Sequence, residues 1–318
     1  MTFRKIIGFG DSSFVISLPK SWVQSHNLVK GDTLSVEEDG GLLRIIPHNL
    51  KQTAAQKEIT ITFDGNLRNL KSRLVHAYIN NYSTININGK NFDEKSKELR
   101  ELIGSFIALE ALQYSNEKII IKDFLNISDV SVYDLIRRMD RINLSMMEDT
   151  KKILKGEVSE QNYLNNRDDD VNKICNLILK VLKRAQNASD MKLLGLQFND
   201  IFYYWDLALN IEIIADQLKR IARRTDYHPD KNMLSIYDEV VESYKTAMKC
   251  NFSQNKETAV ELIVKSKNLF ERCDEIIKNL KKDNINEAYN YFLTLSNIKL
   301  IHVHTSNITK TLLKLGMN

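Results

Sequence analysis

The chain has 318 residues, a hydrophobic content of 43%, a charged content of 27% and a formal net charge of +4. These values are typical of a globular protein with two or three domains. Because the sequence has no run of about 18 apolar residues and no apolar segment near its start, we expect neither membrane insertion nor a signal peptide. Its 3 cysteines form no closely spaced pair, which predicts a reduced, cytoplasmic protein without disulfide bonds.

Residues 1–48 are predicted to form a small β-rich unit. The expected elements are strands at 3–10 and 13–18, a short helix at 19–27, a turn and strand within 28–38, and a last strand at 42–47. Pro19 suits the first turn of the short helix. Strands this few bury too little apolar surface, so we do not expect one copy of the unit to be stable alone.

A mixed α and β segment follows. Residues 48–57 are polar and weakly patterned, which is typical of a linker, whereas residues 58–125 alternate in the order βαβαββ. The expected strands are 58–63, 83–88, 108–114 and 118–125, and the expected helices are 66–81 and 93–106. This order predicts a small α+β layer.

From Ser131 onward the pattern is helical, and 8 of the 11 glycines lie at or before Gly104. The expected helices are 131–155, 159–186, 191–224, 233–250, 257–281 and 286–315. Three long helices, an interruption and three more indicate two tandem three-helix bundles, over 130–226 and 232–316. The predicted fold class is therefore multidomain and mainly α.

Two spaced motifs in the first segment, SFVISLPKSW and LVKGDTLSVEE, resemble the SpoVT/AbrB-like family of DNA-binding domains. The resemblance implies a swapped-hairpin β-barrel, in which two copies interleave their strands and bind double-stranded DNA. It also implies that DNA faces the first strand and the turn after it. The positions concerned hold Arg4, Lys5, Ser12 and Ser13, with Lys20 nearby. Lysine, arginine and serine side chains all donate to phosphate oxygens.

The charge of this segment leaves a second interpretation open. Residues 1–50 contain five Lys and Arg against five Asp and Glu, and Asp11 lies in the turn itself. A carboxylate there repels phosphate, and phosphate contacts supply most of the affinity for DNA. The segment is therefore also compatible with a module that only dimerises the chain.

The helical half resembles the PhoU family at RDDDVNKICNLI, residues 167–178, and at NIEIIADQLKRIA, residues 210–222. Archaeal PhoU proteins with an AbrB-like head also carry a mixed α/β segment like that at 58–125. The resemblance implies a bound divalent or ferric metal ion. The matching acids are Asp168, Glu212 and Asp216; the family's other acid and its histidine are replaced by Asn172 and Gln217.

Elementary geometry supports both a site and a simpler interpretation of these acids. Residues four apart lie on one helix face, so Glu212 and Asp216 could converge on one hard cation. Acids at this spacing are also typical of a solvated helix face. In the second predicted bundle, Lys299 and Val303 replace the acids, so we expect no cation site there.

The catalytic motifs sought in the sequence, GxxxxGK[ST], GxGxxG after a strand, GxSxG and HExxH, do not occur. We therefore predict that the chain is not an enzyme. The first functional hypothesis is a transcriptional regulator of phosphate or metal status, with an AbrB-like dimeric head and PhoU-like sensor helices. The alternative is a PhoU-type adaptor that modulates a phosphate transporter or a sensor kinase by protein contact, with the head only dimerising.

Overall fold

The computed structural model describes residues 3–11, 13–39, 41–47, 57–157, 162–224, 229–278 and 285–315. The chain divides into two compact units, residues 1–56 and residues 57–318. We call the first the N-terminal unit and describe each unit by itself. The division falls inside the predicted linker, where residues 48–56 lie outside the described part of the chain.

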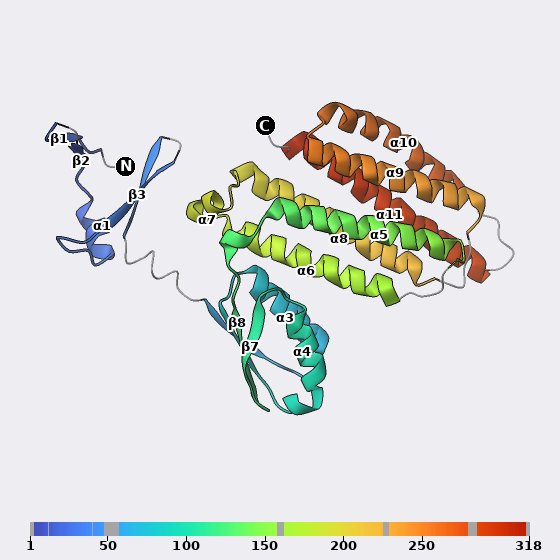
Figure 1. Ribbon diagram of the computed structural model, residues 1–318, viewed down its shortest axis with the longest axis horizontal. Coiled ribbons are helices and arrows are strands. Elements are labelled where there is room, and N and C mark those ends of the chain that lie inside the picture. The colour runs from blue at the N-terminus through green and yellow to red at the C-terminus, as the bar shows by residue number, and fades with distance from the viewer. Residues whose placement is uncertain are drawn as a thin grey trace. The chain divides into compact units, whose positions relative to one another are not determined.

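The N-terminal unit consists of two antiparallel hairpins separated by a short helix (Figure 1). Its elements are β1 (Ile7–Phe9), β2 (Ser13–Val15), α1 (Lys20–Ser25), β3 (Leu34–Asp39) and β4 (Leu42–Pro47). Pro19 precedes α1 directly, as its fixed φ favours. The order of elements agrees with the sequence prediction, but β1 and β2 are shorter than predicted. The strand prediction at 3–6 is wrong, because β1 begins only at Ile7.

The second unit begins with an α+β layer. Its strands are β5 (Glu58–Thr62), β6 (Thr84–Asn88), β7 (Leu109–Tyr114) and β8 (Lys118–Asp123), and its helices are α3 (Leu67–Ile79), η1 (Phe92–Lys95) and α4 (Ser96–Gly104). The sheet order is β5-β6-β8-β7, with β5 and β6 parallel around the α3 crossover and the other pairs antiparallel. The predicted βαβαββ order is confirmed.

Isoleucines of the two central strands make one face of the sheet apolar. Ile85 and Ile87 of β6 lie opposite Ile121 and Ile119 of β8, and all four are buried. Residues of α3 and α4 such as Leu74 complete this core. Strand alternation and helix periodicity thus meet in a single apolar layer, as the sequence pattern requires.

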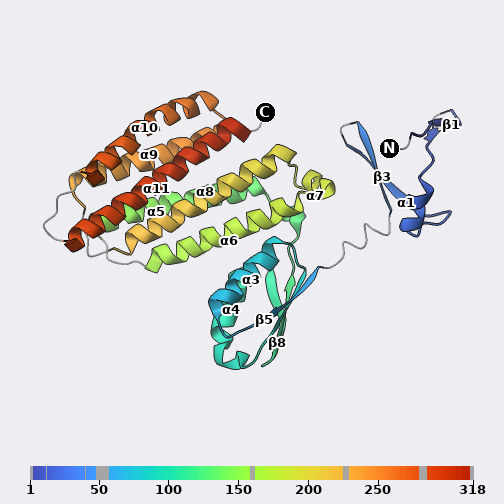
Figure 2. The ribbon, with the colours of Figure 1, turned by 180° about the vertical axis from the view of Figure 1, so that it is seen from behind.

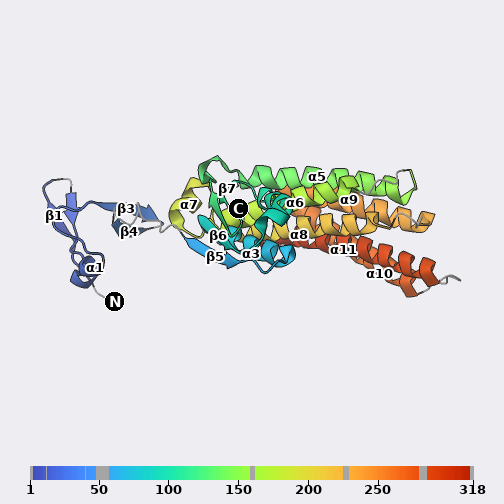
Figure 3. The same cartoon turned by 90° about the horizontal axis from the view of Figure 1, so that it is seen from below.

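Long helices form the rest of the second unit, after the short η2 (Ile127–Asp129). They are α5 (Val132–Leu154), α6 (Asn162–Arg184), α7 (Ala188–Leu193), α8 (Phe198–Ala222), α9 (Lys231–Ser253), α10 (Lys256–Lys278) and α11 (Ile285–Leu315). Figure 2 shows α8 and α11 side by side, and Figure 3 shows the long helices running along a common direction. Most of their buried apolar residues form one continuous core, and Cys250, Ala259 and Leu312 form a small separate cluster. The division into two separate three-helix bundles therefore stays a prediction.

One predicted helix is divided in two. The sequence predicts a helix over 191–224, but the structure has the short α7 and then α8 from Phe198. Gly195 takes a left-handed φ of 64°, which a helix cannot continue. The backbone N–H of Gln197 then donates to Asp200 Oδ2 at 2.8 Å, which caps the new helix.

Candidate functional site

The β1–β2 hairpin is apolar on both faces, and both faces are exposed. Ile7 pairs with Val15 on one face, where Phe9 also lies, and Phe14 pairs with Gly8 on the other. Phe9 is 71% exposed and Phe14 is 79% exposed. Other large apolar side chains exposed in this unit are Phe3, Ile6, Ile16, Val29, Val36 and Leu43. A two-sided apolar strand pair is typical of strands that lie between two other layers.

Four of the five predicted DNA-contacting residues lie within the described part of the chain. Arg4 and Lys5 are exposed in a segment without regular secondary structure just before β1, not within the strand. Ser13 is the first residue of β2 and Lys20 the first of α1, and both are exposed. Ser12 lies outside the described residues. None of the four described side chains is buried, so all are accessible to a ligand.

The turn between β1 and β2 is built on Gly10, whose φ of 68° is in the left-handed region. Asp11 follows it and is exposed. A residue with a side chain is strained at such a φ, which explains why glycine stands here. The exposed Ser13 hydroxyl of this hairpin can donate to a phosphate oxygen.

A second turn, at residues 29–32, leads into the β3–β4 hairpin. The backbone N–H of Val29 donates to Asp32 Oδ2 at 2.7 Å, and Gly31 has a φ of 104°. The Lys-Gly-Asp motif of the sequence therefore forms a closed turn that leads into β3. It is a structural motif, because the Asp32 carboxylate caps its own turn.

In the helical region, the three predicted metal ligands gather around a lysine. Lys219 Nζ donates to Asp168 Oδ2 at 2.5 Å and lies 2.9 Å from Asp216 Oδ1. Asp168 comes from α6, and Glu212, Asp216 and Lys219 come from α8. We call Asp168, Glu212 and Asp216 the carboxylate cluster. Sequence reasoning missed Lys219, although its position three residues after Asp216 is the usual spacing of a helical ion pair.

Burial dominates the electrostatics of the carboxylate cluster. Burial raises the pKa of Glu212, and the negative charges of Asp216 and Asp168 raise it further. Burial also raises the pKa of Asp168, against the hydrogen bond and the charge of Lys219. For Lys219, burial opposes the charged form, but the hydrogen bonds to both aspartates raise its pKa. Lys219 thus bridges Asp168 and Asp216, and Arg220 supplies a second positive charge to Asp216.

These side chains do not form a metal cage as they stand. The Lys219 ammonium binds oxygens of both aspartates, where a cation would have to bind. Asn172 Nδ2 donates to the same Asp168 Oδ2 at 3.1 Å, so its amide presents a donor rather than a ligand oxygen to that carboxylate. In the described part of the chain, no group of three His, Cys, Asp or Glu side chains could hold a metal ion. The metal stays a prediction.

The second predicted bundle has a different set of contacts. Lys299 forms an ion pair with Asp274. His304 Nδ1 and Asn210 Oδ1 are hydrogen-bonded at 2.9 Å, and the ring of His302 lies against the Ser266 carbonyl, with Nε2 at 3.1 Å. Burial lowers the pKa of both histidines. These histidines therefore contribute to the packing of α11 against α8 and α10.

Comparisons with known proteins identify the first segment. Residues 9–53 match the family model described as antidote-toxin recognition MazE, bacterial antitoxin. Neither a curated protein nor a solved structure matches the chain. No helix in the described part of the chain has the length and apolarity needed to cross a membrane. The N-terminal unit is therefore a MazE/AbrB-like domain, whereas the PhoU resemblance of the helices stays a prediction.

Proposed function

We propose that the chain is a homodimeric, cytoplasmic regulator of transcription that binds double-stranded DNA through its N-terminal unit. The observation that carries this proposal is the β1–β2 hairpin, whose two apolar faces are both exposed. A second copy would cover them and complete a shared core. MazE/AbrB-like domains typically dimerise and bind DNA, and the family match covers this hairpin from Phe9 onward.

The exposed cations supply the other half of the argument. A dimer would carry two copies each of Arg4, Lys5 and Lys20, all of which are exposed. Because two related copies contact two half-sites, the distance between them would set the spacing of the DNA sequence bound. Phosphate contacts from these side chains would hold the protein on the duplex, and contacts with base edges would add selectivity.

The helical region is proposed to receive the signal. Its resemblance to PhoU at residues 167–178 and 210–222 suggests phosphate or metal status as that signal. A metal ion at Asp168, Glu212 and Asp216 belongs to this proposal and would have to displace the Lys219 ammonium. Signal binding would then change the distance or angle between the two DNA-binding heads. The proposal includes no catalytic step.

A second candidate function is an adaptor that contacts a phosphate transporter or a sensor kinase. The balance of five basic and five acidic residues over 1–50 favours it, because a neutral head attracts DNA weakly. In that case the N-terminal unit would only dimerise the chain.

Selective binding to the chain's own upstream DNA distinguishes these two functions. Full-length protein is titrated with its upstream duplex and with a random duplex of equal length, over a series of salt concentrations. A regulator should bind its upstream duplex at least roughly 1,000-fold more tightly at physiological salt. Equal, weak binding to both duplexes, at protein concentrations where the dimer is intact, would instead support the adaptor.

A further inference from the structure

A pocket of about 390 Å³ lies between the N-terminal half of α5 and the C-terminal half of α9. Its polar lining includes three cations and a single carboxyl group, contributed by Arg137, Lys245, Lys249 and Asp140. Tyr133 and Phe252 supply aromatic walls. We call it the cationic pocket. Its volume falls within the range usual for sites that hold small molecules.

Arg137 is fixed in place without a carboxylate partner. Its guanidinium lies over the Phe252 ring at 4.9 Å and over the Tyr133 ring at 5.5 Å, and Nη1 donates to the Tyr133 hydroxyl at 3.1 Å. Stacking on two rings holds the planar group while most of its N–H donors remain available. Such a group is suited to bind an oxyanion through two parallel hydrogen bonds.

The two lysines lie one helical turn apart on α9. Lys245 is paired with Glu242 at 2.6 Å, and both side chains are exposed. Lys249, like Arg137, forms no ion pair with any described residue. The pocket therefore has a net positive charge that the folded chain does not neutralise, and an anion would supply the missing charge.

Asp140 gives the pocket a second polar end. The residue is only 8% exposed, and its Oδ1 atom is buried without a hydrogen bond of normal geometry among the described residues, although the buried Tyr244 hydroxyl lies close enough to lower the pKa of this carboxyl group. An unpaired buried acceptor is costly in a folded protein. A ligand that carries a hydroxyl or amino group next to its anionic group would satisfy this oxygen.

We propose that the cationic pocket binds a phosphate monoester of a sugar or nucleoside. The phosphoryl group would lie against Arg137 and Lys249, and a hydroxyl group of the sugar would donate to Asp140 Oδ1. This proposal goes beyond the function proposed above, and it stands whether or not the N-terminal unit binds DNA. It gives the helical region a ligand site distinct from the carboxylate cluster, which lies on α6 and α8.

Calorimetric titration of the full chain tests the proposal directly. The probes are ribose 5-phosphate, AMP, inorganic phosphate and adenosine, in the absence of DNA. Both phosphate esters are expected to bind, adenosine is expected not to bind, and inorganic phosphate is expected to bind more weakly than the esters. Arg137→Ala and Lys249→Ala should each weaken ester binding by about tenfold or more, the usual loss for a charged hydrogen bond.

Two further variants make the test specific. Arg138→Ala removes another exposed arginine, next to Arg137, that does not line the pocket, and it should leave ester binding unchanged. Asp140→Leu should weaken ester binding, while binding of inorganic phosphate should be unchanged or stronger. Circular dichroism checks that each variant is folded.

Two outcomes would overturn the proposal. The first is that neither ester binds; if Arg137→Ala and Lys249→Ala then reduce affinity for duplex DNA, this face is part of a DNA-binding surface instead. The second is that Arg138→Ala weakens ester binding as much as Arg137→Ala does, which would indicate a general attraction of anions to the surface.

Discussion

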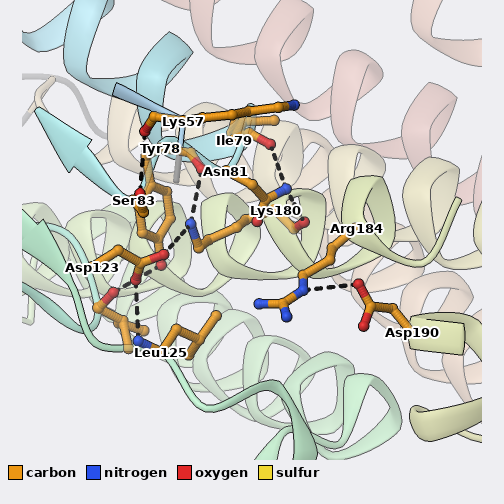
Figure 4. Close-up of polar contacts among 11 residues, drawn as sticks. Lys57, Tyr78, Ile79, Asn81, Ser83, Asp123, Leu125, Lys180, Arg184 and Asp190 are labelled. Carbon is orange, nitrogen blue, oxygen red and sulfur yellow. Dashed lines mark hydrogen bonds and ion pairs between the residues drawn. The ribbon is translucent and has the colours of Figure 1, made fainter. Parts of the chain in front are cut away.

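Lys180 of α6 and Asp123 of β8 form a buried ion pair, with Nζ and Oδ2 2.8 Å apart (Figure 4). The lysine side chain is only 1% exposed. Nζ also donates to the Tyr78 carbonyl oxygen at 3.1 Å and lies 4.5 Å from the centre of the Tyr78 ring. In addition, Asn81 Nδ2 donates to the Lys180 carbonyl oxygen at 3.2 Å. One lysine thus joins the α+β layer to the long helices.

Removing one partner of this pair should be strongly destabilising. Asp123→Asn leaves the Lys180 ammonium buried without its counter-charge, which typically costs about 3–5 kcal/mol in the free energy of unfolding. Urea denaturation followed by circular dichroism measures this cost. Asp190→Asn is the control, because it breaks a more exposed pair with Arg184, and it should cost about 1 kcal/mol or less. Equal costs for the two variants would show that the buried pair does not join the layers.

The exposed hairpin predicts a dimer that depends on Phe14. If a second copy buries this ring, Phe14→Ser removes about 2 kcal/mol of apolar burial per copy. The dimer dissociation constant should then rise by roughly 1,000-fold. Sedimentation velocity over a concentration series measures the change.

A phenylalanine of the second unit provides the control for that experiment. Phe124 is 53% exposed, and Phe124→Ser should leave the dimer intact. A Phe14→Ser protein that dimerises as tightly as the unsubstituted chain would contradict the shared core.

Because Asp140 is buried, the free energy of unfolding should depend on pH. Burial raises its pKa to about 6, although the Tyr244 hydroxyl and two arginines, Arg137 and Arg141, act in the opposite direction. Between this value and the usual aspartate pKa near 4, the folded chain holds a proton that the unfolded chain has released. Stability from this group is therefore present below about pH 4 and is lost as the pH rises through about 6.

Asp140→Asn should remove this loss. The stability advantage of the variant over the unsubstituted chain should grow by about 1.4 kcal/mol between pH 5 and pH 8. Urea denaturation at both pH values measures it. Glu148→Gln changes an exposed acid on the same helix and should show no such growth. A constant difference for Asp140→Asn would mean that the carboxyl group is not buried as described.

Removing Lys219 should make the carboxylate cluster respond to metal ions. Lys219→Met leaves Asp168, only 3% exposed, without its ammonium partner. We expect a loss of about 2–4 kcal/mol in the free energy of unfolding, because a largely buried carboxylate becomes uncompensated. Mg²⁺ or Mn²⁺ should restore part of this loss, since both prefer carboxylate oxygens.

Arg220 is the matched control, because it forms an exposed ion pair with Asp216. Arg220→Met should cost less than about 1 kcal/mol and should not respond to either ion. If elemental analysis finds metal in the purified unsubstituted protein, Glu212→Gln with Asp216→Asn should remove it. Equal losses for Lys219→Met and Arg220→Met, with no response to either ion, would contradict the bridging role of Lys219.

The sequence predicted most elements because each pattern is local. The predicted strands at 83–88 and 118–125 contain β6 and β8, and the predicted helix at 131–155 ends within one residue of α5, before Gly156, whose φ is 73°. The break at Gly195 was missed although the residue was visible, because the apolar pattern continues through Met191 and Leu194. The left-handed conformation of Gly195 ends the helix even though the apolar periodicity continues.

Contacts between distant segments could not be predicted in this way. Lys180 lies in the apolar stretch LILKVLK, and only the packing of the α+β layer against α6 shows that it is buried and paired. The gathering of Asp168 and Asp216 was predicted from helix spacing and resemblance. The ammonium between them was not, because nothing in the sequence says which cation meets the acids.

The most direct test of DNA binding by the N-terminal unit uses the double variant Arg4→Ala with Lys5→Ala. Its affinity for the upstream duplex and for a random duplex is measured over a salt series, beside Lys30→Ala, which removes another exposed cation of the same unit. The account predicts weaker binding of the double variant to both duplexes, and a smaller dependence on salt because fewer counterions are released. It also predicts an intact dimer and a smaller effect for Lys30→Ala. Unchanged binding of the double variant at low salt would contradict the account.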